Sequence, residues 1–134
     1  MKVYTDGACR GNPGPAAFAF IISSIPESRA SGYIGVATNN RAEYTAIIEA
    51  LRELKRIEYE GDVELFSDSE VVVRQLLGEY EVKNAGLKSL WTIVMELSDK
   101  MVLVPTHVPR THPMIKQCDA MCNATLDKET HRVW

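Results

Sequence analysis

Hydrophobic residues recur along the chain with two different periods, and the changes of period predict where strands and helices lie. Residues 2–6 alternate as a strand does, whereas apolar residues between Tyr44 and Leu54 return every three or four positions, as on one face of a helix. Strands are predicted over residues 2–6, 16–23, 31–36, 63–67 and 101–108. Helices are predicted from Asn39 to the break at Gly61, from Ser69 to Leu77, from Asn84 to Leu97 and from Ile115 to Leu126, before a polar tail, expected to be frayed, over residues 127–134.

The order of these elements predicts the fold class. Short turns join the first three strands, which favours an antiparallel meander, whereas helices precede the last two strands, which are therefore expected to be parallel. We expect a single α/β domain over residues 1–134: a mixed five-stranded sheet, antiparallel in strands 1–3 and parallel in strands 4–5, flanked by helices. Pro105 places the last strand at an edge or a bulge.

Composition excludes some classes of protein and leaves others open. The chain has 134 residues, 46% of them hydrophobic and 25% charged, which is ordinary for one globular domain, and it has no apolar run of the roughly 20 residues that a membrane span needs. A strand pattern from Met1 onward argues against a signal peptide. The formal net charge of −3 disfavours a strongly basic nucleic-acid binder, although clustered acids can carry this charge beside a local basic patch.

The cysteines predict a reducing, cytoplasmic setting. Their number, three, is odd and their spacing does not resemble a zinc motif. Cys118 and Cys122 lie one helical turn apart and are expected to be small core residues rather than a metal or redox pair.

Four acidic residues lie at junctions between predicted elements. Asp6 ends the first strand, Glu43 lies in the first turn of a helix, Asp68 follows the fourth strand, and Asp119 opens the last helix. The carboxyl ends of parallel strands and the amino ends of the helices that follow share one edge of a sheet, so these side chains are expected to meet there.

Each acid also has an ordinary structural explanation. Glu43 has capping-box spacing from Asn40, Asp68 could cap a helix, and Asp119 would suit a helix N-terminus, whereas Asp6 on a core strand needs a partner. Four converging carboxylates would repel one another without cations, and their hard oxygen atoms favour Mg²⁺ or Mn²⁺ over zinc. Two such ions about 3.5–4 Å apart would suit in-line displacement at phosphorus.

Small and amide-bearing residues accompany these acids. The turn at residues 11–14 and the amides of Asn39 and Asn40 could donate hydrogen bonds to a sugar–phosphate backbone without reading bases. A contact to a 2′-hydroxyl is what would distinguish RNA from DNA at such a site.

Together these motifs resemble ribonuclease H of type 1. The blocks that carry the resemblance are residues 5–9 with 11–14, 38–43, 67–69 and 118–119, with a weaker block at residues 78–90. The resemblance spans nearly the whole chain and implies a ribonuclease H-like fold. It also implies hydrolysis of the RNA strand of RNA–DNA hybrids to 3′-hydroxyl and 5′-phosphate ends.

The resemblance also implies roles for individual residues. Two Mg²⁺ ions, for which Mn²⁺ can substitute, would be held by Asp6, Glu43, Asp68 and Asp119. Cys9, Asn12, Asn39, Asn40 and Ser69 match positions that meet the minor groove or 2′-hydroxyls, and Thr38 and Arg41 match positions near substrate phosphates.

The chain departs from the family pattern in two regions. Residues 78–84 are short and lack the basic handle of many bacterial members, which predicts a compact form with modest affinity. In the loop before the last helix, the position of a histidine that assists catalysis in many members falls on Pro109. His112 could substitute for it, and the alternative is an ordinary exposed loop histidine.

The same loop holds other candidates. Ile115 stands where members often have Asn, and Arg110 and Lys116 are candidates for phosphate contact. We expect a monomeric endonuclease acting on hybrids. The alternatives are a non-catalytic ribonuclease H-like module that binds nucleic acid or protein and a domain detached from a reverse transcriptase, and the intact set of four acids disfavours the first of these.

Overall fold

A computed structural model describes residues 1–24 and 26–130. The sheet has the strand order β3-β2-β1-β4-β5; β1 pairs with β2, and β2 with β3, antiparallel, whereas β1 with β4 and β4 with β5 are parallel. The predicted fold class is confirmed, and Pro105 lies in an edge strand. The elements are β1 (Lys2–Cys9), β2 (Gly14–Ser23), β3 (Ser28–Ala37), α1 (Asn39–Arg56), β4 (Asp62–Ser67), α2 (Glu70–Leu76), α3 (Ala85–Leu97), β5 (Val102–His107) and α4 (Pro113–Thr130).

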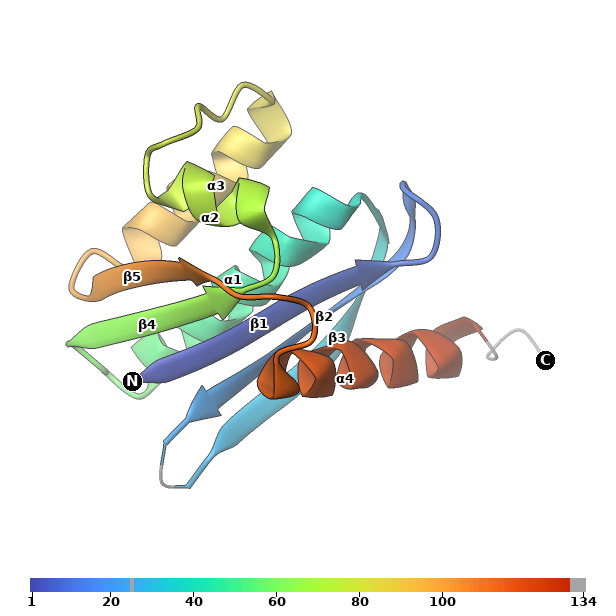
Figure 1. The fold of residues 1–134 in the computed structure, drawn as a ribbon, viewed down its shortest axis with the longest axis horizontal. Coiled ribbons are helices and arrows are strands. Elements are labelled where there is room, and N and C mark those ends of the chain that lie inside the picture. Colours follow the sequence, from blue (N-terminus) through green and yellow to red (C-terminus); the bar gives the residue numbers. More distant parts are fainter. Residues whose placement is uncertain (25, 131–134) are drawn as a thin grey trace.

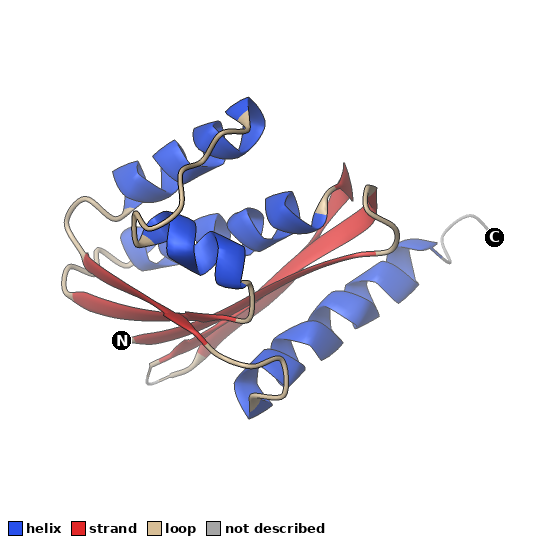
Figure 2. Cartoon of the chain, turned by 45° about the horizontal axis from the view of Figure 1, so that its top comes forward, coloured by secondary structure: helices blue, strands red, loops and turns tan. Residues whose placement is uncertain are grey.

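The helices cover the two faces of the sheet unequally. Helix α1 packs on β1 and β2 and is itself covered by α3, whereas α4 packs on β1, β2 and β3 from the other face (Figures 1 and 2). The larger core lies beneath α1 and includes Tyr44, Leu51 and Leu65, each fully buried. The smaller core lies beneath α4 and includes Cys118 and Cys122, which confirms that these cysteines are core residues.

The first hairpin extends further than its residue pattern indicates. Strand β1 continues to Cys9, which pairs with Ala16, and the Arg10 N–H donates to the Pro15 carbonyl at 2.8 Å. A Cβ on Gly14 would lie 2.0 Å from the Arg10 carbonyl oxygen, so this tight closure requires glycine.

The capping-box interpretation of Glu43 was wrong. The N-cap of α1 is Thr38, whose hydroxyl oxygen accepts a hydrogen bond from the Arg41 N–H at 3.3 Å. The cap is therefore completed without Glu43, and its carboxylate turns instead toward β1 and β4.

The bounds of the last helix also differ from the prediction. Helix α4 begins at Pro113, where a proline costs no hydrogen bond, so Asp119 lies in the second turn rather than at the opening. The helix continues to Thr130, so residues 127–130 of the predicted tail are helical, and the remainder of that prediction lies outside the described residues. No helix in the described part of the chain is long and apolar enough to span a membrane.

Candidate active site

Three of the predicted acids converge where β1, α1 and the β4–α2 junction meet. Oxygen atoms from the carboxylates of Asp6, Glu43 and Asp68 all lie within 4.8 Å of one another. Asp6 is only 4% exposed and Glu43 only 7%, while Asp68 is half-buried. The three side chains therefore meet as predicted, although Asp6 lies within β1, which continues to Cys9, and not at the end of that strand.

Glu43 is held by donors from the two central strands. The Gly7 N–H donates to its Oε1 at 3.2 Å, and the Ser67 hydroxyl donates to its Oε2 at 3.4 Å. A Cβ on Gly7 would lie 2.3 Å from the Ala42 carbonyl carbon, so only glycine lets β1 approach α1 this closely. The side chain is thus fixed by the fold before any ligand binds.

Burial, with repulsion by neighbouring carboxylates as a smaller cause, raises the pKa values of all three acids. The pKa of Asp6 rises to about 7, chiefly because the group is buried and secondly because Asp68 is nearby. The pKa of Glu43 is raised well above its ordinary value by burial and by the charges of Asp6 and Asp68. Burial also raises the pKa of Asp68, against the opposing effect of the Arg110 guanidinium.

This donor set fits a divalent cation. Hard carboxylate oxygens at this spacing are the ligands that Mg²⁺ and Mn²⁺ prefer, and a cation among them would relieve the repulsion that raises their pKa values. The cluster is therefore compatible with metal binding, in agreement with the chemistry expected from these residues.

Asp119 lies at the rim of the cluster rather than within it. Its side chain is exposed, and its charge contributes to the raised pKa of Asp6. It lines the same groove as the three converged acids. The fourth predicted acid thus reaches the site from the opposite face of the sheet, at a greater distance from the centre.

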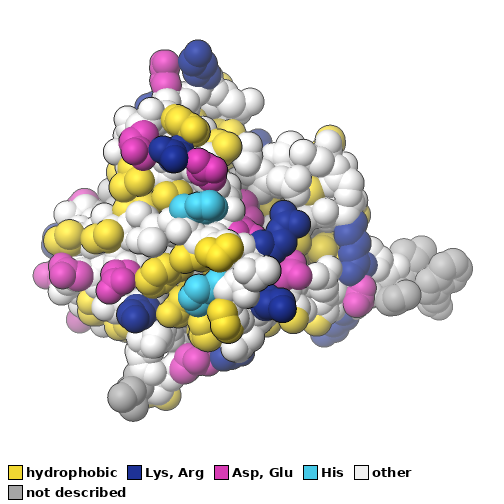
Figure 3. Space-filling model, viewed as in Figure 1, with side chains coloured by type: hydrophobic (Ala, Val, Ile, Leu, Met, Phe, Trp, Pro, Cys, Tyr) yellow, Lys and Arg dark blue, Asp and Glu magenta, His cyan; other side chains and the backbone are white. Residues whose placement is uncertain are grey.

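A groove of about 650 Å³ lies over the acids. Four of the predicted substrate-binding residues, Cys9, Asn39, Asn40 and Ser69, line it. Arg110 and Lys116 bring positive charge to the same groove, and Figure 3 shows Lys and Arg side chains (dark blue) beside acidic ones (magenta) on this face. Its other lining residues are Gly7, Ala8, Thr111 and Ile115.

A second hollow of about 510 Å³ continues the groove past the start of α1. The two hollows share Asn39 and Asn40, and the other three predicted substrate contacts, Asn12, Thr38 and Arg41, line the second. Asn84, the N-cap of α3, and Leu87 within that helix complete it, and neither is among the predicted site residues. Asn84 was interpreted only as the start of a helix, a role it also fills by accepting a hydrogen bond from the Leu87 N–H.

The groove wall is built from hydrogen bonds between the hairpin and α1. The Cys9 thiol donates to Asn39 Oδ1 at 2.8 Å, and the Asn39 N–H donates to Asn12 Oδ1 at 3.0 Å. Ser69 caps α2, with its hydroxyl accepting from the Val72 N–H at 3.4 Å. These residues therefore have local structural roles as well as exposed positions beside the acids.

His112 lies beside the groove without lining it. Its Nδ1 accepts a hydrogen bond from the Met114 N–H at 3.1 Å, at the start of α4. Its ring lies 5.5 Å from that of Tyr4 and 6.4 Å from that of Phe66, measured between centroids. The histidine is thus packed against the sheet rather than free in the loop.

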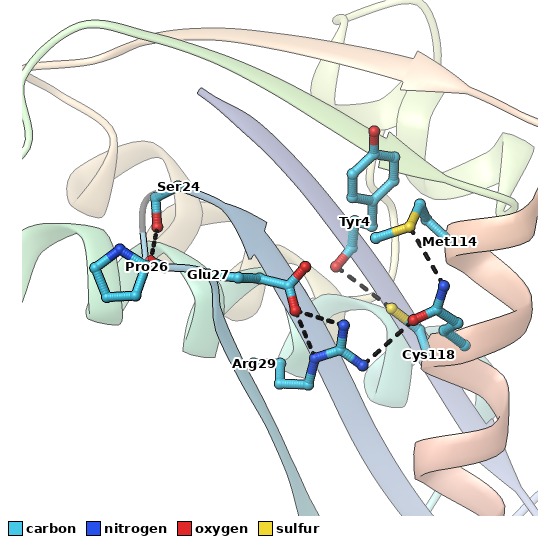
Figure 4. A network of polar contacts seen from close by, with 8 residues as sticks. Tyr4, Ser24, Pro26, Glu27, Arg29, Met114 and Cys118 are labelled. Carbon is cyan, nitrogen blue, oxygen red and sulfur yellow. Dashed lines mark hydrogen bonds and ion pairs between the residues drawn. The ribbon is translucent and has the colours of Figure 1, made fainter.

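Polar contacts tie the first half of α4, which carries Asp119, to the sheet (Figure 4). Arg29, at the start of β3, bonds both Glu27, at 2.5 Å, and the Gln117 side-chain oxygen, at 3.3 Å. The Cys118 thiol donates to the Tyr4 carbonyl at 3.6 Å. Asp119 therefore follows a residue that is hydrogen-bonded to the strand bearing Asp6.

Comparison with known proteins shows the family to which this chain belongs. The family model for RNase H matches residues 1–127. The chain belongs to the RNase H family. The match spans all four acids of the site and almost all of the described chain.

Individual members of the RNase H family agree with this assignment. A ribonuclease HI from Halobacterium salinarum is 37% identical over 95% of this chain, and a ribonuclease H from Chlorobium luteolum is 34% identical over 96%. The chain spans 64% of the length of the Halobacterium relative and 97% of the Chlorobium relative. The crystal structure of LC11-RNase H1 in complex with an RNA/DNA hybrid has a TM-score of 0.86 and 34% identity, covering 96% of this chain and 98% of that one.

Proposed function

We propose that this protein is an endoribonuclease that hydrolyses the RNA strand of RNA–DNA hybrids, leaving 3′-hydroxyl and 5′-phosphate ends. The observation that carries the proposal is the convergence of Asp6, Glu43 and Asp68 within 4.8 Å beneath a groove lined by amides and cations, in a chain of the RNase H family. The hybrid bound by LC11-RNase H1 supports this substrate class.

The proposed cofactor is a pair of Mg²⁺ ions, for which Mn²⁺ can substitute. Asp6, Glu43 and Asp68 would hold them from the centre of the site, and Asp119 from its rim. When bound, such ions activate the attacking water and stabilise the departing oxygen. The support for this proposal is the chemistry of the carboxylate set and the repulsion within it.

The remaining chemistry belongs to this chain's own residues. Gly7 and Ser67 keep Glu43 aimed at the centre, so the site needs no rearrangement of that side chain. Amides and hydroxyls of Asn39, Asn40 and Ser69, with the Cys9 thiol, are positioned to bond the sugars of the RNA strand. Contacts of this kind orient a backbone and can detect a 2′-hydroxyl.

Phosphates of the hybrid would meet two sets of cationic or polar residues. Arg110 and Lys116 would contact the strand near the acids, and Arg41 with Thr38 would contact a phosphate in the second hollow, which Asn12 and Asn84 also line. We propose that His112 shapes the loop bearing Arg110, because its ring and Nδ1 are both engaged in packing and capping.

The deciding experiment compares labelled RNA–DNA, RNA–RNA and DNA–DNA duplexes, each with Mg²⁺ and with chelator. We expect metal-dependent cleavage of the RNA strand of the hybrid alone. Hybrid binding without metal-dependent cleavage would contradict the enzyme and support a non-catalytic module.

We also propose that the 134 residues form one domain that acts as a monomer in a reducing, cytoplasmic setting. The single continuous sheet and three free cysteines support this proposal. Light scattering of the purified protein at working concentration tests the monomer directly.

A further inference from the structure

The turn between β1 and β2 contacts both α1 and α4, the two helices that carry acids of the site. At its tip, Asn12 Oδ1 accepts from the Asn39 N–H and so ties the hairpin to α1, the helix of Glu43. In the same turn, directly after β1, the Arg10 guanidinium bonds α4, the helix of Asp119. The same hairpin contributes Cys9 to the groove and Asn12 to the second hollow.

The contact between Arg10 and α4 has two acceptors. Nη2 of Arg10 lies 2.5 Å from Asp127 Oδ1 and 3.4 Å from the Asn123 carbonyl oxygen, across a separation of more than 110 residues. Arg10 therefore points toward the far end of α4, and it lines neither hollow. Asp127 lies in the segment that was expected to be a frayed tail, and it is helical.

We propose that the Arg10–Asp127 pair is a positioning device that holds the substrate-facing hairpin against α4. The backbone around it is tightly closed, because Arg10 N–H bonds the Pro15 carbonyl and Gly14 admits no Cβ. Because this turn is tightly closed, a contact that restrains Arg10 also restrains the positions of Cys9 and Asn12. This inference rests on the proposed function and adds a role for the end of α4.

For hybrid binding by Asp127→Asn, the positioning role predicts a change opposite in sign to the one expected from the loss of a negative charge alone. If Arg10 instead contacted a substrate phosphate directly, Asp127→Asn would free it and remove a negative charge, and hybrid binding would tighten. If the pair positions the hairpin, Asp127→Asn weakens binding even though it makes the protein less acidic. The three central acids are held by other contacts, so kcat is expected to stay near that of the wild type.

The test measures kcat and KM for hybrid cleavage by Arg10→Ala, Asp127→Asn and the double variant. An exposed ion pair of this kind supports a two- to fivefold effect, roughly, so each single variant is expected to raise KM by about that factor. The double variant is expected to match the single ones, and the charge swap Arg10→Asp with Asp127→Arg is expected to restore KM. Asp99→Asn, at an exposed site beyond the end of α3, is the matched control for loss of one acid.

A second readout needs no substrate. Hydrogen exchange at the Arg10 and Asn39 amides, which close and anchor the hairpin, is expected to quicken about two- to fivefold in Asp127→Asn at unchanged melting temperature. Unchanged or lower KM in Asp127→Asn, with an active wild type, would overturn the positioning role. An inactive wild type would overturn the proposed function instead. In that case the exchange measurement still tests the positioning role, and unchanged exchange at these two amides in Asp127→Asn would overturn it.

Discussion

Replacing Asp6 by Asn is expected to stabilise the metal-free protein while destroying its activity. The pKa of Asp6 is about 7 in the folded chain, against an ordinary value of 3.8. Between these values the folded state binds more protons than the unfolded state, so the free energy of unfolding falls as pH rises. The destabilisation that ionised Asp6 causes is absent below about pH 4 and fully present above about pH 7.

The size of the effect follows from the same two values. A difference from 3.8 to about 7 corresponds to about 4 kcal/mol of destabilisation once Asp6 is ionised. Asparagine has nearly the same shape, carries no charge and can donate its amide to the neighbouring Glu43 carboxylate. We expect a gain of about 2–4 kcal/mol at pH 8, because burying the amide offsets part of the benefit. For a chain of this length that is a rise of roughly 8–16 °C in Tm.

Thermal and urea unfolding in chelator, from pH 4 to pH 8, would measure this gain. The stability difference between the variant and the wild type is expected to grow with pH across that range. Asp119→Asn is the matched control, since it removes the same charge from an exposed rim position and is expected to change stability by only about 0.5 kcal/mol. A variant that is less stable than the wild type at pH 8 would refute the reasoning, because it would show that the Asp6 charge has a stabilising partner within the fold.

Three further substitutions test other parts of the site. Asp68→Asn is expected to abolish cleavage yet leave hybrid affinity within about threefold, measured by fluorescence anisotropy; an equal loss of binding would contradict its role at the centre. Lys116→Ala, made in the inactive Asp68→Asn protein, should reduce the slope of the logarithm of the hybrid-binding constant against the logarithm of salt concentration by about 1. Lys100→Ala, at an exposed position just before β5, should leave that slope unchanged. His112→Ala should lower the free energy of unfolding by about 1–2 kcal/mol, from the lost cap and ring contacts, with kcat within about threefold. A hundredfold fall in kcat at unchanged Tm would instead make His112 a catalytic residue.

The sheet and the central acids could be predicted because both follow from local pattern. Period-two and helical spacing mark residues that must be buried, and the strand-to-helix junction after β4 marks the place of Asp68, next to the β1 strand that carries Asp6. Glu43 could be placed near them because it lies close to the start of α1, although it falls in the second turn of the helix and not in the first. The capping-box explanation of Glu43 was wrong because Thr38, and not Asn40, is the N-cap of α1. Both residues are plausible caps by sequence, and only the course of the backbone decides between them.

Features that depend on pairing between separate segments were not predictable in this way. Strand β1 reaches Cys9 because Ala16 pairs with it across a closed hairpin, and Asn84 joins the site because α3 packs beside the start of α1. The helical state of Asp127 likewise accompanies a contact with Arg10 more than 110 residues away. Local composition there, polar and close to the end of the chain, indicates fraying and carries no sign of a partner.

The position of the fourth acid follows from which face of the sheet its helix covers. Asp6 lies in β1, Glu43 in α1 and Asp68 directly after β4, and all three of these elements contribute residues to the larger core. Asp119 comes from α4 on the opposite face, so only the first half of that helix reaches the groove, and its carboxylate stays exposed at the rim. Its placement therefore depends on contacts spread along α4, from Gln117 and Cys118 to Asp127. Changes far along this helix should consequently alter the rim of the site while the three buried acids keep their geometry.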